Sequence, residues 1–358
     1  MATLTIHTDK ILSNIKKVDS FLKQRGIQWS FITKMACGHK PVLEKILHDE
    51  YLFNLHSIGD ARLSNLKVIK DINPGLKTIY IKPPAVNQVE NVVEVADVSL
   101  NSSLKTIIEL NEAAKKQDKL HEVIVMIEMG ELREGIVREN IISFYSKIFE
   151  LSHIKIIGLG TNLGCMYGVE PTYDKLIQLS LYKLLLEEKF QKEIPLISGG
   201  SSITLPLVDK KLPQSVNHLR IGETVFHGFS LIDGKRFKNL STKAFNFSAE
   251  IIELEKKDSI PDGLISEANV GHAAAYANTT NMLTYKSILD FGTIDVDYDD
   301  LTPLDNSIQF VGTTSDMTVY DLKQNTEKHK VGSKIQFIPN YMATARLMNS
   351  KYITKIIK

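Results

Sequence analysis

The sequence predicts a (β/α)8 TIM barrel followed by a mostly β C-terminal domain. Strand-like and helix-like segments alternate eight times from Trp29 onward. After Ser241 the pattern changes to runs with strand periodicity. The length of 358 residues also exceeds the usual size of one hydrophobic core. A large domain and a smaller one are therefore expected.

The eight strand-like runs are short and apolar, and each is followed by a helix-like stretch. They are Trp29–Lys34, Leu52–Ile58, Thr78–Ile81, Asp97–Leu100, Val123–Glu128, Ile154–Thr161, Pro195–Ser198 and Asn217–Ile221. Eight β/α units over roughly 200 to 250 residues are typical of a barrel. A doubly wound open sheet shows the same alternation, so periodicity leaves that alternative open.

The first helix is expected to begin at Thr8 and Asp9, because both residue types favour helix starts. Apolar side chains then recur at helical spacing as far as Gly26, namely Ile11, Leu12, Ile15, Val18 and Leu22. Other helix-like stretches include Pro41–Glu50, Asn87–Ala96, Leu104–Lys116, Asn140–Leu151 and Tyr173–Lys192. The predicted barrel domain spans residues 8–240.

The predicted second domain spans residues 241–358. Its strand-like segments are FNFSAEIIELE, SIQFVGT, MTVYDL and KIQFIPN, with turns at Asp262-Gly263 and Val331-Gly332. The opening ATLTIHT also looks like a strand, and a lone strand needs a sheet to pair with. Residues 1–7 are therefore assigned to the second domain.

Composition indicates a small-molecule partner. The net charge is +1, and no block of like charges indicates a nucleic-acid or anionic-membrane surface. No apolar stretch is typical of a signal peptide or a membrane span. Cys37 and Cys165 are too few for a disulfide framework. We therefore expect a cytoplasmic protein that binds neither nucleic acid nor membrane.

Candidate site residues follow the carboxyl ends of the predicted barrel strands, which meet at one mouth in this fold. They are Lys34 after the first strand, Arg133 after the fifth, Asn162 after the sixth, Ser198–Ser202 after the seventh, and Arg220 with Gly222 on the eighth. Each residue alone has an ordinary structural explanation, such as a surface lysine or a flexible Gly-Ser turn. Their joint placement favours one ligand, with phosphate held by the loops after the last two strands.

The motifs TKMACG, SIGDARLSNL, ADVSLNS, ELREG, GTNLGC, SGGSS, LRIGE, LTPLD, TSDMTVYDL and NYMATARLM resemble the alanine/ornithine racemase family. They are most similar to the ornithine racemase branch. The resemblance implies a pyridoxal 5′-phosphate enzyme with a barrel and a β domain. It also implies a homodimer whose active sites lie at the subunit interface.

The resemblance also implies roles for individual residues. Lys34 matches the lysine that binds pyridoxal phosphate covalently, and Arg220 matches the arginine facing the pyridine nitrogen. Arg133 matches the arginine near the phenolic oxygen. Asn162 falls where alanine-type enzymes place a histidine against the ring. The phosphate is expected at Ser201, Ser202 and the backbone of Gly222. No metal site is expected.

These roles predict interconversion of L- and D-amino acids by two bases through a carbanion at Cα. Lys34 would be the base on one face. The alanine-type Ser-Tyr-Gly motif, which carries the opposite base, is absent from the sequence. His272 and Tyr276, in the stretch IPDGLISEANVGHAAAYANTT, are the candidates in its place. The substrate is expected to be ornithine-like or another amino acid.

Two alternatives remain from the sequence alone. The first is a D-amino-acid lyase of the same barrel class, which would need a His-x-Cys metal pair in the second domain, and no cysteine follows Cys165. The second is a pyridoxal-phosphate-binding or homeostasis protein, which would resemble the barrel alone. The length of the second domain argues against it.

Overall fold

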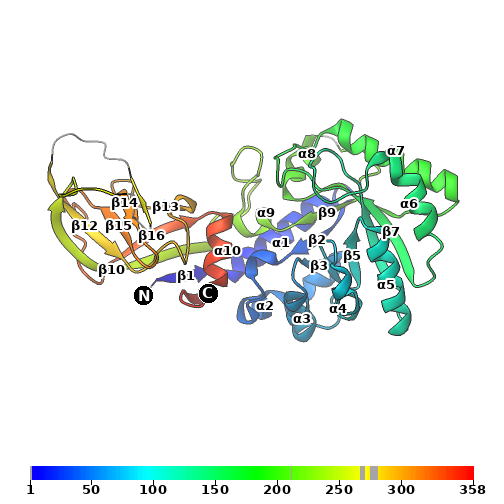
Figure 1. Cartoon of the computed structure of the whole chain (residues 1–358), viewed down its shortest axis with the longest axis horizontal. Coiled ribbons are helices and arrows are strands. Elements are labelled where there is room, and N and C mark those ends of the chain that lie inside the picture. The colour runs from blue at the N-terminus through cyan, green and yellow to red at the C-terminus, as the bar shows by residue number, and fades with distance from the viewer. Residues whose placement is uncertain (1, 211, 267–270, 275–280) are drawn as a thin grey trace. The chain divides into compact units, whose positions relative to one another are not determined.

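A computed structural model of the chain describes residues 2–210, 212–266, 271–274 and 281–358. The chain forms two compact units. One comprises Lys10–Thr242, and the other combines Met1–Asp9 with Lys243–Lys358 (Figure 1). The predicted architecture, a TIM barrel with a mostly β C-terminal domain, is confirmed.

The first unit is a closed barrel of eight parallel strands, which excludes the open doubly wound sheet. The strands are β2 (Gln28–Ile32), β3 (Ser57–Asp60), β4 (Thr78–Tyr80), β5 (Val98–Asn101), β6 (His121–Met126), β7 (Ile154–Gly160), β8 (Leu196–Ser198) and β9 (His218–Ile221). The register of β2 against β9, with Gln28 opposite His218, closes the barrel. All eight strands therefore point their carboxyl ends to one mouth.

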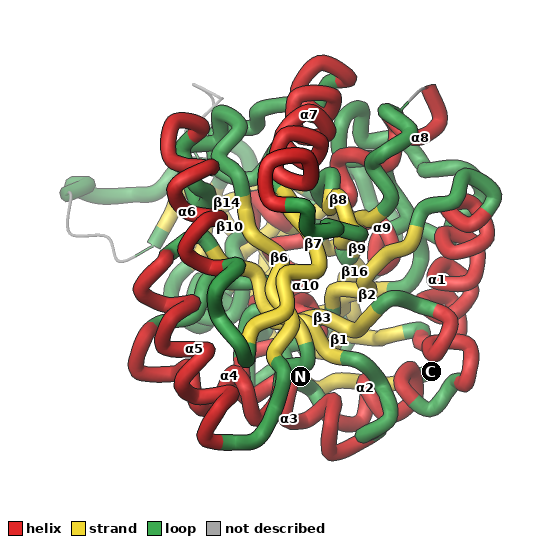
Figure 2. Tube along the Cα trace, turned by 90° about the vertical axis from the view of Figure 1, so that its right-hand side faces the viewer, coloured by secondary structure: helices red, strands yellow, loops and turns green. Residues whose placement is uncertain are grey.

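Helices surround the barrel strands (Figure 2). They are α1 (Thr8–Lys23), α2 (Lys40–Leu47), α3 (Leu63–Ile72), α4 (Val89–Val95), α5 (Leu104–Lys116), α6 (Ile141–Ile148), α7 (Tyr173–Phe190), α8 (Leu205–Lys210) and α9 (Glu223–His227). Helix α1 has the apolar spacing expected of it, because Ile11, Ile15, Val18 and Leu22 are all buried. Apolar side chains from neighbouring strands, including Ile79, Val98, Ile124 and Leu196, form part of the barrel core.

The predicted strand Leu52–Ile58 began too early in the chain. Strand β3 covers only Ser57–Asp60, and the preceding Glu50–Asn54 forms a 3-10 turn. The Asp49 side chain accepts a hydrogen bond from the Tyr51 backbone N–H at 2.9 Å, which favours that turn. In the turn Leu52 is buried while Phe53 is 56% exposed, so only one of these two apolar side chains contributes to the core.

The described residues of the second unit form a nine-stranded sheet. Its elements are β1 (Thr3–Ile6), β10 (Phe245–Asp258), β11 (His272–Ala273), β12 (Leu283–Leu289), β13 (Leu301–Pro303), β14 (Gln309–Thr313), β15 (Thr318–Asp321), β16 (Lys334–Pro339), α10 (Tyr341–Asn349) and β17 (Thr354–Ile357). As expected, β1 joins this sheet, antiparallel to β10 and parallel to β17. Strands β11, β12, β13 and β17 and helix α10 were not predicted.

Candidate active site at the barrel mouth

Lys34 lies directly beyond strand β2, where it begins a 3-10 turn over Lys34–Ala36. The preceding residue, Thr33, is fixed to strand β3. Its backbone N–H donates to Gly59 O at 2.8 Å, and its hydroxyl donates to Asp60 Oδ2 at 3.0 Å. Burial raises the pKa of the Asp60 carboxyl, which also accepts from Arg62 N and Asn65 Nδ2. The Lys34 backbone is thus anchored while its side chain is exposed.

Arg220 lies in strand β9 and is buried. Its Nη1 donates to Ser198 Oγ at 2.5 Å, and its Nη2 donates to Thr161 O at 2.9 Å. These acceptors come from the carboxyl ends of β8 and β7, so three strand ends meet at the guanidinium. Burial lowers the pKa of Arg220 to about 10, which leaves it protonated at neutral pH.

The loops after strands β8 and β9 meet at Ser202. The backbone N–H groups of Gly222 and Thr224 both lie 3.3 Å from Ser202 Oγ, which accepts from them. Gly222 packs closely against strand β2, because a Cβ at this position would lie 2.7 Å from Ile32 O. Ser201 directly precedes the turn Ser202–Thr204. The predicted phosphate residues therefore lie together, and Gly222 packs against Ile32, two positions before Lys34 in the chain.

Arg133 lies in the loop after strand β6. Glu128 shapes this loop by accepting hydrogen bonds from Gly130 N at 2.7 Å and Leu132 N at 2.9 Å. Arg133 pairs with Glu134, with 2.6 Å between Nη2 and Oε1. The hydrogen bond that Arg133 donates to the Glu134 carboxylate raises the pKa of Arg133. The guanidinium of Arg133 is therefore charged and held from one side by a carboxylate.

Asn162 and Cys165, in the loop after strand β7, also contact Arg133. Arg133 Nη1 lies 2.7 Å from Cys165 Sγ. With its amide oxygen toward Arg133, Asn162 accepts hydrogen bonds from Nη2 at 2.5 Å and Nη1 at 3.2 Å. The structure thus brings two of the predicted residues, Arg133 and Asn162, into direct contact.

A buried carboxylate that the sequence analysis missed holds this loop. Glu131 accepts hydrogen bonds from five consecutive backbone N–H groups, those of Gly164, Cys165, Met166, Tyr167 and Gly168, at 2.7–3.2 Å. Burial alone would raise the pKa of Glu131, but these donors outweigh it and lower the pKa. The loop therefore depends on one side chain 33 to 37 positions earlier in the chain.

The groups around Arg220 and those around Arg133 lie close enough for their charges to interact. After burial, the charges that act on the pKa of Arg220 belong to Glu134, Arg133 and Cys165. Burial raises the pKa of Glu223, and the charge of Lys34 opposes that shift. A lysine, two arginines and small hydroxyl-rich loops therefore surround one region. This arrangement can bind an anionic, planar ligand and hold an amine beside it.

The other predicted candidates are His272 and Tyr276. His272 is in strand β11 of the second unit, exposed and paired with Thr313. Tyr276 lies outside the described residues. Among the described residues, no three His, Cys, Asp or Glu side chains are grouped as a metal ion would require. No helix within the described part of the chain is both long and apolar enough to cross a membrane.

Comparison with known proteins extends the resemblance to the whole chain. Residues 6–228 match the family described as alanine racemase, N-terminal domain. The ornithine racemase of Acetoanaerobium sticklandii is 32% identical over 98% of each chain. The lysine racemase of Thermotoga maritima is 26% identical over 99% of this chain and 97% of its own.

Solved structures match the fold. The alanine racemase of Clostridium difficile 630 superposes with a TM-score of 0.74 at 15% identity, covering 100% of this chain and 95% of that one. That of Corynebacterium glutamicum gives 0.73 at 17% identity, covering 100% and 99%. The family match over residues 6–228 and the 32% identity to the ornithine racemase show that the chain belongs to the alanine racemase family. Within that family it is an amino-acid racemase.

Proposed function

We propose that this racemase uses pyridoxal 5′-phosphate, held covalently by Lys34, to interconvert the enantiomers of a dibasic amino acid of the ornithine and lysine type. The observation that carries the proposal is the meeting of Lys34, Arg133 and Arg220 at one barrel mouth. The substrate class is supported by the two full-length relatives, which are an ornithine and a lysine racemase.

The residues present fit this cofactor. Ser201, Ser202 and the Gly222 backbone offer small donors for a phosphate. Position 222 lies so close to the Ile32 carbonyl that only glycine fits there. Thr161 Oγ1 is buried and has no hydrogen-bond partner among the described residues, although the Thr161 carbonyl binds Arg220. A ring bound beside Arg220 would give that hydroxyl a neighbour. When bound, pyridoxal phosphate acts as an electron sink that acidifies the substrate Cα–H.

Arg220 would face the pyridine nitrogen and donate a hydrogen bond to it. Two of its five N–H bonds are used by Ser198 and Thr161. An arginine with a pKa of about 10 keeps its proton at neutral pH, so it does not protonate the ring nitrogen. A bound ring whose nitrogen stays unprotonated would be a weaker electron sink than a protonated one. It would therefore favour return of the proton to Cα over transfer elsewhere. Arg133 and Asn162 would hold the phenolic side of the ring.

Lys34 would take or return the Cα proton on one face of the substrate. A proton carrier is also needed on the opposite face, and we propose that a second copy of the chain supplies it. His272 and Tyr276 are the candidates for this carrier. Because the carrier would come from the second copy, the enzyme would be a homodimer with shared active sites. Cys37 and Cys165 are not joined by a disulfide bond, which supports a cytoplasmic location.

The test is a chiral assay of the purified protein with pyridoxal phosphate. L-Ornithine, L-lysine and L-alanine are incubated separately in D2O, and the enantiomers are resolved by chromatography. We expect both dibasic substrates to yield D product with deuterium at Cα, and alanine to react at least tenfold more slowly. Deuterium uptake without inversion would contradict the two-base proposal, and preferred turnover of alanine would contradict the substrate class.

A further inference from the structure

A chain of buried polar groups lies inside the barrel behind Arg220. Ser198 Oγ, which accepts from Arg220 Nη1, lies 2.9 Å from His218 Nδ1. The other ring nitrogen, His218 Nε2, lies 3.0 Å from Ser30 Oγ. Ser198, His218 and Ser30 are all 0% exposed. Arg220 is therefore connected to groups that water does not reach.

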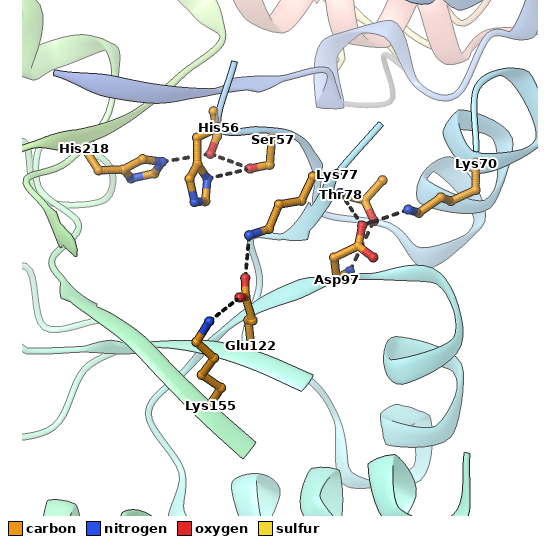
Figure 3. A network of polar contacts seen from close by, with 10 residues as sticks. His56, Ser57, Lys70, Lys77, Thr78, Asp97, Glu122, Lys155 and His218 are labelled. Carbon is orange, nitrogen blue, oxygen red and sulfur yellow. Dashed lines mark hydrogen bonds and ion pairs between the residues drawn. The ribbon is translucent and has the colours of Figure 1, made fainter. Parts of the chain in front are cut away.

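The chain continues away from Arg220 to His56. Ser30 Oγ lies 2.7 Å from Ser57 Oγ, which lies 3.1 Å from His56 Nδ1. Figure 3 shows His218, Ser57 and His56 in this sequence of contacts. The rings of His56 and His218 lie 4.7 Å apart, centroid to centroid. Strands β2, β3, β8 and β9 thus share one internal hydrogen-bonded line.

The chemistry of Arg220 fixes the direction of these bonds. A guanidinium only donates, so Ser198 Oγ accepts from it and is left with one hydrogen to give. His218 Nδ1 is the acceptor for that hydrogen. A neutral imidazole with an accepting Nδ1 carries its proton on Nε2, which then donates to Ser30. Ser30 in turn donates to Ser57, and Ser57 donates to His56 Nδ1.

The opposite direction leaves a group unsatisfied. If His218 Nδ1 carried the proton, Ser198 would accept from both His218 and Arg220. Its own hydroxyl hydrogen would then have no partner among the bonds that the described residues make. A doubly protonated His218 would add a second cation next to Arg220. Burial opposes that state by lowering the pKa of His218 well below its ordinary value, and His56, Arg220 and Lys77 add to the effect.

From this geometry we infer that Ser198 and neutral His218, protonated on Nε2, position Arg220 for its role at the cofactor ring. The inference rests on the proposed function. Ser198 presents a lone pair to the guanidinium only while its hydrogen points to His218. His218 and Ser198 are positioning residues, because they act through Arg220 rather than on substrate.

The first test observes the histidine directly. Long-range ¹H–¹⁵N spectra of the full-length, ¹⁵N-histidine-labelled protein distinguish the two neutral tautomers and the charged ring. We expect His218 to be neutral and protonated on Nε2 between pH 6 and 8. A proton on Nδ1, or a charged ring, would overturn the inference. This readout needs no turnover, so it stands apart from any failure of the proposed racemase activity.

The second test compares two buried Ser–His pairs by racemase kinetics. Ser198→Ala removes the acceptor of Arg220 Nη1, and we expect kcat to fall about tenfold while KM changes less than twofold. Ser198→Thr, which keeps the hydroxyl, should recover most of kcat. Ser99→Ala is the matched control, because Ser99 Oγ lies 2.7 Å from His121 Nε2 in an equally buried pair that does not touch Arg220.

The control separates positioning from general packing. We expect Ser99→Ala to keep kcat within twofold of the wild type. An equal loss in Ser99→Ala and Ser198→Ala would mean that any buried Ser–His bond supports the barrel in this way, and would overturn the inference. Failure of Ser198→Thr to recover kcat would also overturn it.

Discussion

The two ends of the barrel both carry charged side chains, but they use them differently. At the N-terminal end, Lys77 and Lys155 both pair with Glu122, at 2.5 and 3.3 Å (Figure 3). Lys70 pairs with Asp97 at 2.8 Å. These charges compensate one another across the starts of the strands. They also line a cavity of about 600 Å³.

At the mouth, the lysine and both arginines lie around one region, with Glu134 and Glu223 as the nearby carboxylates. Groups that take no part in chemistry hold the neighbouring segments. Asp60 holds Thr33, next to Lys34, and Glu131 holds the loop whose Cys165 contacts Arg133. The comparison indicates that ion pairs at the N-terminal end stabilise the fold, whereas the lysine and arginines at the mouth are placed to bind a ligand. Substitutions at the two ends should therefore change different measurements.

The largest effect is expected from Lys34→Ala. The substitution removes both the covalent anchor of the cofactor and the base on one face, so racemisation should fall by more than about 10³-fold. Mass spectrometry after borohydride reduction should show cofactor attached to the wild type and not to the variant. Lys40→Ala, an exposed change in helix α2, serves as the control. Retained racemisation would refute the role of Lys34.

Arg220→Glu should have the next largest effect. A carboxylic acid at this position can protonate the pyridine nitrogen and strengthen the electron sink. Racemisation should fall about 10²- to 10³-fold while side transamination rises relative to it. Keto-acid production, measured beside the D-amino acid, gives that ratio. A change in cofactor affinity alone, with an unchanged ratio, would contradict this account.

Glu131→Ala should have an intermediate effect. Five backbone N–H groups lose their acceptor, so the loop Gly164–Gly168 should lose its fixed conformation and Cys165 and Asn162 their contacts with Arg133. We expect kcat to fall about tenfold. Hydrogen exchange should become faster in this loop and stay unchanged in strand β7. Protection of the loop equal to that of the wild type would show that other contacts hold it.

At the N-terminal end, Glu122→Gln should lower the free energy of unfolding by about 1 kcal/mol and leave kcat within twofold. Burial alone would raise the pKa of Glu122, but the hydrogen bonds from Lys77 and Lys155 outweigh it and lower the pKa below 4.5. The carboxylate therefore adds stability above that pH and loses it as the pH falls. The difference between wild type and variant in urea unfolding should shrink below pH 4.5. A difference that stays constant with pH would contradict this.

The smallest effect is expected from Lys155→Ala. Its side chain is 56% exposed, and Glu122 keeps Lys77 as a partner. Surface pairs of this kind contribute less than about 0.5 kcal/mol. The midpoint temperature of thermal unfolding, Tm, should fall by no more than about 2 °C. A shift as large as that of Glu122→Gln would mean that the network acts as one unit.

The barrel could be predicted because its signals are local. Short apolar runs alternate with helical periodicity, and the residues just past each run are at the mouth whenever the strands are parallel. Lys34 and Arg133 were found in this way, whereas Arg220 was found on the last predicted strand itself. The roles assigned to them came from the family resemblance and remain proposals.

The supporting groups could not be predicted, because they depend on pairs far apart in the chain. Glu131 binds a loop more than thirty positions later, and Ser30 meets His218 across the closure between β2 and β9. A charged residue two positions before Arg133 was the only sequence signal for Glu131. The turn at Leu52 was mistaken for a strand because apolar content alone does not reveal the capping by Asp49.

Strand β1 has a consequence for how the chain is made. Thr3–Ile6 is synthesised before the barrel, but its neighbours β10 and β17 are synthesised only after it. A four-residue segment must stay available, with its backbone groups solvated, while more than two hundred later residues emerge. A tag or fusion partner at the N-terminus that captures this segment would delay completion of the β unit rather than of the barrel.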